Sequence, residues 1–102
     1  MEELKTWPES FQAIWDGLKT YEVRKADREF KLWNVVWLRE YDPNKKKYTG
    51  REMAANITYI TNWIDSVSMF PFLTHVPEFV VFGLKVYQKI DKSDVSSKAP
   101  KL

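Results

Sequence analysis

The chain has 102 residues, of which 44% are hydrophobic, and five Trp, five Tyr and six Phe supply large apolar groups. This size fits one domain with a real hydrophobic core. The formal net charge is +2, which permits binding to nucleic acid without demanding it. Cysteine is absent and His75 is the single histidine, which excludes disulfides, iron–sulfur clusters and thiolate zinc sites. We therefore expect no metal and no cofactor.

The N-terminal stretch MEELKTWPES is acidic and mixed in character, unlike a signal peptide. No run of residues approaches the roughly 18 consecutive apolar residues of a membrane helix. We therefore expect a soluble, cytoplasmic protein with no membrane contact.

The first elements are a strand and a helix. Residues 3–7 predict a short strand that stops at Pro8, because proline donates no N–H to a strand ladder. Apolar residues then recur with helical spacing at Phe11, Ile14, Trp15 and Leu18. This pattern predicts a helix over 8–16, with Gly17 as its terminator.

The remaining elements are strands, recognised by β-branched and aromatic residues. They are predicted over 20–25, 35–42, 48–61 and 78–90. Segment 26–34 has few apolar anchors and is predicted to be a loop, and the Asp-Pro-Asn turn makes 35–61 a hairpin. Bends or bulges are expected near Gly50 or Ala54–Ala55 and at Gly83.

Segment 62–77 is apolar but has no clean periodicity, so we expect a loop with one helical turn. Residues 1–90 then form a single domain, and 91–102 form a disordered C-terminal tail. The fold class is mainly β, or α+β: a small barrel with one or two short peripheral helices.

The strand over 20–25 raises the question of function. Side chains alternate in a strand, so Thr20, Glu22 and Arg24 share one face. Tyr21 and Val23 share the other face. The charged face has two interpretations: an ordinary water-facing surface with balanced charges, or a site that binds a ligand.

The sequence from residue 3 to about residue 60 resembles the DUF3850 family of the ASCH superfamily, whose fold is the PUA-like β-barrel. The resemblance rests on LKTWPESFQAIWDGLKTYEVRK, followed by DREF, LREYD, YTGRE and ITYI, with FVVFGL as the closing strand. The sequence departs from the family pattern at three places. Ala26 replaces an Asn, Trp33-Asn34 replaces a Gly-Asp turn, and Glu2 or Glu3 stands where many members have a His.

ASCH and PUA-like domains are generally associated with RNA or modified nucleotides. The resemblance therefore implies a binding module that recognises RNA or a nucleotide in a charged cleft. The residues expected to bind the ligand are Lys19, Glu22, Arg24, Asp27, Arg28 and Arg51. Arginine and lysine suit phosphate, and aromatic side chains such as Trp7 or Tyr41 can stack a base.

Two alternatives remain open. Some ASCH relatives resemble hydrolases of amidohydrolase or ribonuclease type, and in such an enzyme Lys19 and Glu22 are the catalytic candidates. The other alternative is a phage-type protein-interaction factor that binds through exposed aromatic residues. We expect a binding module rather than an enzyme. The sequence leaves the oligomeric state open, including a homodimer.

Overall fold

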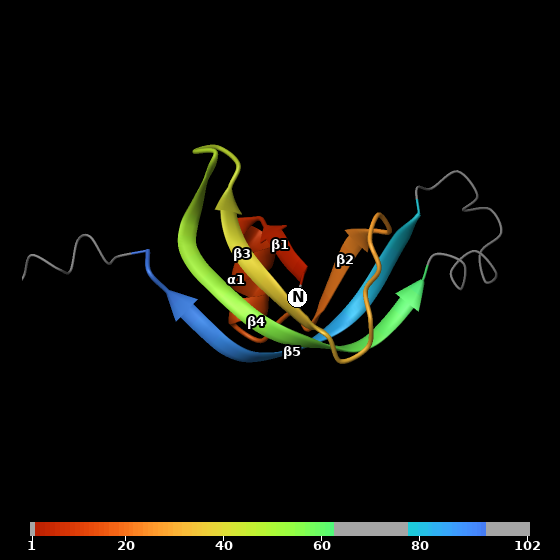
Figure 1. The fold of residues 1–102 in the computed structure, drawn as a ribbon. Helices are drawn as coiled ribbons and strands as arrows, with labels where there is room; N and C mark the ends of the chain where they lie inside the picture. Colours follow the sequence, from red (N-terminus) through yellow and green to blue (C-terminus); the bar gives the residue numbers. More distant parts are fainter. Residues whose placement is uncertain (1, 63–77, 94–102) are drawn as a thin grey trace, which may run out of the picture.

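The computed structural model describes residues 2–62 and 78–93, and its elements follow the predicted order (Figure 1). They are β1 (Glu2–Thr6), α1 (Pro8–Trp15), β2 (Tyr21–Lys25), β3 (Val35–Asp42), β4 (Lys47–Asn62) and β5 (Phe79–Asp91). The mainly-β class with a short helix is therefore confirmed. Residues 63–77, with His75, and residues 94–102 lie outside the described part, and so do most of the predicted 62–77 loop and 91–102 tail. Asp91, predicted as the start of the tail, is the last residue of β5.

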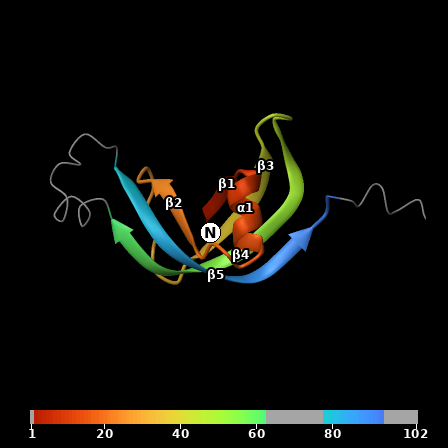
Figure 2. The ribbon, with the colours of Figure 1, turned by 180° about the vertical axis from the view of Figure 1, so that it is seen from behind.

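The strands form one five-stranded sheet in the order β1-β3-β4-β5-β2. β1 pairs with β3 in parallel, and the other neighbours are antiparallel. The sheet curls into a half-barrel whose curved floor is made by the long strands β4 and β5, and α1 lies on its hollow side (Figures 1 and 2). β1 and β2 are the two edges of this sheet, and no backbone ladder joins them.

Apolar side chains from the helix and the sheet fill the hollow side. The buried cluster consists of Leu4, Phe11, Ile14, Val36, Leu38, Met53, Ala55, Ile57, Val80, Phe82 and Leu84. The prediction that Leu18 continues the apolar face of the helix is wrong, because Leu18 is 83% exposed. Gly17 takes a left-handed φ of 77° and ends the helix before Leu18 can join that face.

Bulges bend the two long strands. A register shift lies between Ala54 and Ala55, where a bend or bulge was predicted, and its extra residue is Tyr87 of the partner strand β5. The predicted bulge at Gly83 is instead located in the partner strand, where Thr58 is the extra residue. A Cβ on Gly83 would lie 2.7 Å from the Thr58 hydroxyl oxygen. The glycine therefore makes room for a bulge in β4.

Candidate functional site

The charged face of β2 points into the half-barrel rather than toward solvent. Glu22 is 3% exposed, whereas Tyr21 and Val23 on the other face are about half exposed. The sheet register explains this orientation, because Glu22 lies opposite Phe82, a fully buried core residue. The interpretation as an ordinary water-facing strand surface is therefore wrong for Glu22.

Both carboxylate oxygens of Glu22 are hydrogen-bonded. Oε1 accepts from Lys19 Nζ at 3.1 Å and from the Ser10 hydroxyl at 3.2 Å, and Lys19 Nζ also donates to Ser10 Oγ at 2.5 Å. Oε2 accepts from Arg24 Nε at 2.8 Å, and Arg24 Nη2 lies 2.6 Å away. A buried carboxylate needs hydrogen bonds and opposite charges of this kind to offset the loss of its hydration. Glu22 thus holds the Lys19 and Arg24 side chains in fixed positions.

Arg24 also joins the two edges of the sheet. Its guanidinium donates to the Lys5 carbonyl at 2.9 Å and to the Thr6 hydroxyl at 3.1 Å, both on β1. Arg28 continues the same connection, because it donates to the Glu3 carbonyl and pairs with Glu2 at 2.9 Å. Side chains therefore close the half-barrel where no backbone ladder exists.

The turn after α1 brings Lys19 to Glu22. Gly17 N–H donates to the Ile14 carbonyl, and the Leu18 and Lys19 N–H groups both donate to the Ala13 carbonyl, which folds the chain back tightly at the helix end. Ser10, on α1, then faces the same point from the helix side. The local reason for this geometry is the helix terminator at Gly17.

These side chains line an open depression of about 320 Å³, which we name the cationic cleft. Its lining consists of Lys5, Thr6, Trp7, Ser10, Lys19, Glu22, Val23, Arg24 and Lys25. Four of these residues are cationic and Glu22 is the single anionic one. Lys19 and Arg24 point at Glu22, whereas the Lys5 amine lies over the Tyr41 ring, 4.3 Å from its centroid. Lys25 lies at the rim, on the exposed face of β2. Such a cleft favours an anionic ligand.

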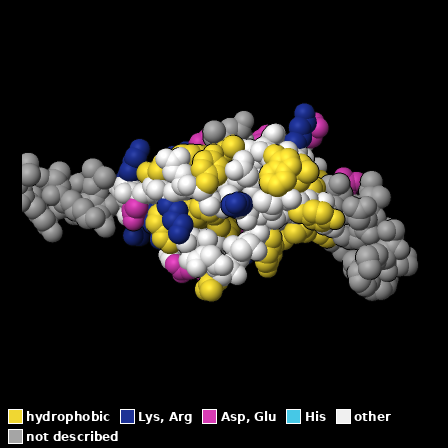
Figure 3. Space-filling model, turned by 90° about the horizontal axis from the view of Figure 1, so that it is seen from below, with side chains coloured by type: hydrophobic (Ala, Val, Ile, Leu, Met, Phe, Trp, Pro, Cys, Tyr) yellow, Lys and Arg dark blue, Asp and Glu magenta, His cyan; other side chains and the backbone are white. Residues whose placement is uncertain are grey.

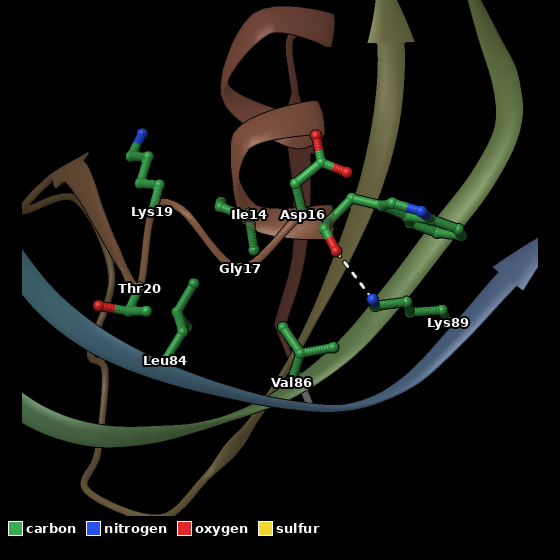
Figure 4. A pocket seen from close by; sticks show the side chains of 9 residues that line it. Ile14, Asp16, Gly17, Lys19, Thr20, Leu84, Val86 and Lys89 are labelled. Carbon is green, nitrogen blue, oxygen red and sulfur yellow. Dashed lines mark hydrogen bonds between the residues drawn. The ribbon is translucent and has the colours of Figure 1, made fainter.

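A second depression, of about 300 Å³, lies on the other side of Lys19, between the end of α1 and β5 (Figure 4). Its floor is apolar, with Ile14, Leu84 and Val86. Lys89 donates to the Trp15 carbonyl at 2.7 Å, and the Lys19 amine points away from this floor. The Lys89 amine is therefore engaged by a backbone carbonyl and the Lys19 amine by Ser10 and Glu22. We place the candidate site in the cationic cleft.

Arg51, expected beside the other site residues, lies in a separate ion pair with Glu40. Its Nε and Nη2 each donate to a Glu40 oxygen at 2.9 Å, and Nη2 also donates to Gln12 of α1 at 2.7 Å. Burial opposes ionisation of Glu40, but hydrogen bonds from Arg51 and Thr49 outweigh it and hold the pKa of Glu40 below its usual value. This pair fastens the helix to β3 and β4.

The structure therefore divides the six predicted site residues. Lys19, Glu22 and Arg24 meet in the cationic cleft. Asp27 lies 3.6 Å from Arg28 at the outer end of the β1–β2 seam, and both are well exposed. Sequence reasoning missed Ser10 and Thr6, because a single hydroxyl on a predicted helix or strand carries no pattern that points to a distant partner.

The outer face of the sheet carries apolar groups with Lys and Arg between them (Figure 3). Tyr59 is 71% exposed there, and Tyr21 and Val23 lie across β5 from it. Within residues 2–62 and 78–93, no cluster of His, Asp and Glu could hold a metal ion. The helix in that part of the chain is too short and too polar to cross a membrane.

Solved structures show what class of fold this is. The crystal structure of ASCH from Zymomonas mobilis has a TM-score of 0.58 at 15% identity, covering 98% of this chain and 79% of that chain. Two mutants of that protein are also similar, each at 16% identity and with 98% of this chain covered. The serine-to-alanine mutant has a TM-score of 0.60 with 80% of its chain covered, and the tyrosine-to-phenylalanine mutant has a TM-score of 0.57 with 81% covered. The fold is therefore of ASCH type.

Family models place the chain more narrowly. Residues 1–68 match the model described as "Domain of unknown function (DUF3850)". The chain therefore belongs to the DUF3850 family, as its sequence motifs indicate. No curated protein shows a significant match.

Proposed function

We propose that this ASCH module binds RNA or a nucleotide, with phosphate groups in the cationic cleft. The observation that carries the proposal is that Lys19 and Arg24 converge on the single carboxylate of Glu22. Lys5 and Lys25 add positive charge at the rim of the cleft. Cations provide most of the affinity of proteins for nucleic acids. The cleft also falls within the range of about 300–1,000 Å³ typical of small-molecule sites.

The hydrogen bonds inside the cleft leave donors for a ligand. The Lys19 ammonium has three N–H groups, and the structure uses two of them, on Ser10 and Glu22. Of the five guanidinium N–H groups of Arg24, four face Glu22, Lys5 and Thr6, which leaves one on Nη1. Glu22 fixes both cations before a ligand arrives, and such preorganisation lowers the entropic cost of binding.

Binding of a labelled short oligouridylate, followed by fluorescence anisotropy, tests this proposal. Lys19→Ala and Lys25→Ala each remove a cleft cation and should weaken binding several-fold. Lys85→Ala is the matched control, because Lys85 is an exposed lysine on β5, outside the cleft. Melting temperatures establish that each variant folds. Equal losses in all three variants would mean that binding follows overall charge and that the cleft is not the site.

The position of Ser10 supports a second candidate function, a small hydrolase of modified nucleosides or RNA. The Ser10 hydroxyl lies between the Lys19 amine and the Glu22 carboxylate, which are the candidate acid–base pair. This candidate ranks second because both Glu22 oxygens already have partners, so a proton transfer to Glu22 requires one partner to move. Turnover of acetylated or methylated nucleosides that persisted unchanged in Lys19→Ala would rule out this assignment.

A further inference from the structure

Another pocket, separate from the depression at the end of α1, adjoins the cationic cleft and shares Trp7 with it. This Trp7–Pro43 pocket has a volume of about 440 Å³ and is lined by Trp7, Pro8, Glu9, Asp42, Pro43 and Asn44. Trp7 lines both depressions. Trp7 is the N-cap residue of α1, and it is 63% exposed. An indole has no acceptor for the helix N–H groups, so the ring plays no part in capping the helix. A ring exposed between two depressions is available to stack a base.

The charge of this pocket is opposite to that of the cleft. Glu9 and Asp42 are anionic, and within the described part of the chain no Lys or Arg lines the pocket. Such a lining repels phosphate and suits an uncharged group that presents N–H donors. A nucleic acid strand supplies both chemistries, because its phosphates are anionic and its bases are neutral and aromatic.

The polar groups of the pocket match one base best. Asp42 Oδ1 accepts from the backbone N–H groups of Asn44 and Lys45, which fixes the carboxylate. Among the residues that the structure describes, none donates to Asp42 Oδ2. The Glu9 carboxylate and the Asn44 side-chain amide form no hydrogen bond within residues 2–62 and 78–93. Guanine carries two adjacent donors, N1–H and the 2-amino group, beside the O6 acceptor. A carboxylate can accept from the two donors while an amide donates to O6.

We propose that the Trp7–Pro43 pocket is a guanine subsite for an RNA strand whose phosphates lie in the cationic cleft. This inference rests on the proposed function and adds a base preference to it. The indole of Trp7 stacks the base, the Glu9 carboxylate accepts from both of its N–H groups, and Asn44 donates to O6. Glu9 is the acceptor because Asp42 Oδ1 already accepts two backbone N–H groups. Uracil lacks the adjacent donor pair and gains only the stacking.

The test compares a short oligouridylate with the same oligomer carrying one guanosine or one inosine. Guanosine should bind about tenfold more tightly, since a well-placed bidentate contact discriminates by roughly that factor or more. Inosine lacks the 2-amino group and should lose most of the gain. Glu9→Gln and Asn44→Ala should remove the guanosine preference, because each changes a group that bonds to the base. Both side chains are exposed, so neither change should unfold the chain. Neither should weaken the binding of oligouridylate.

The outcomes separate the two proposals. If guanosine gives no gain, or if the gain survives in both variants, the guanine subsite is overturned. The binding function still stands in that case if Lys25→Ala weakens oligouridylate. If no oligomer binds even at low salt, both proposals fall.

Discussion

Replacing Arg24 with methionine tests whether side chains close the half-barrel between β1 and β2. Methionine keeps much of the apolar stem and removes the guanidinium, which bonds to Glu22, to the Lys5 carbonyl and to the Thr6 hydroxyl. Hydrogen bonds that involve a charged group contribute about 1.5–3 kcal/mol each. The substitution also removes one of the cations that offset the cost of burying the Glu22 carboxylate, which is 3% exposed.

Two features reduce the cost of this substitution. The Arg24 side chain is 24% exposed, so water replaces part of what is lost, and Glu22 keeps Lys19 and Ser10. We therefore expect Arg24→Met to lower the free energy of unfolding by about 2–4 kcal/mol. This is a large share of the roughly 5–15 kcal/mol of a typical domain.

Arg28→Met is the matched control, because Arg28 spans the same seam. Its side chain is 41% exposed and its partner Glu2 is 40% exposed. A solvated pair of this kind contributes about 0–1 kcal/mol. Urea denaturation followed by circular dichroism measures both variants. Equal losses, or a loss below about 1 kcal/mol for Arg24→Met, would refute the reasoning that the buried bridge closes the barrel.

Three further predictions concern the scaffold. The pKa of Glu40 is lower in the folded chain than in the unfolded chain, so its stabilisation is present at neutral pH and is lost as the pH falls through the native pKa. In Glu40→Gln, the urea midpoint should therefore fall less steeply between neutral and acid pH than in the unchanged protein. An equally steep fall would contradict this. Gly83→Ala should cost about 1–3 kcal/mol because its Cβ meets the Thr58 hydroxyl, and Thr58→Ala should restore part of the loss in the double variant. Trp33 has a φ of 68° and is 64% exposed, so Trp33→Gly should leave the melting temperature unchanged or raise it, whereas a marked fall would show that the indole is needed.

The sequence predicted the order of elements because local chemistry fixes it. Pro8 opens the helix, Gly17 ends it, and Asp42-Pro43-Asn44 turns the hairpin. The family pattern also expects a glycine near Trp33, and the structure gives Trp33 the left-handed backbone that glycine adopts most easily. Such features depend on a few neighbouring residues, so they can be read along the chain.

The grouping of the charged side chains depended on long-range geometry instead. Glu22 is buried because β2 pairs with β5 in a register that places it beside Phe82. Arg51 points to Glu40 because β4 lies beside β3. It contacts the helix at Gln12, whereas Lys19 contacts it at Ser10. A list of charges along the sequence contains none of this information. The motif therefore indicated Lys19, Glu22 and Arg24 correctly as neighbours, and could not separate them from Arg51.

The salt dependence of oligouridylate binding tests the central claim most directly. Phosphate contacts with single strands lower the logarithm of affinity by about 0.7 per contact for each tenfold rise in salt. With two to four of the cleft cations engaged, the account predicts a slope of about −1.4 to −2.8 between about 50 and 200 mM salt. It also predicts that Lys25→Ala makes the slope shallower and that Lys85→Ala does not. Absence of binding at the lowest salt, or a slope that Lys25→Ala leaves unchanged, would contradict the assignment of the cationic cleft as a phosphate-binding site.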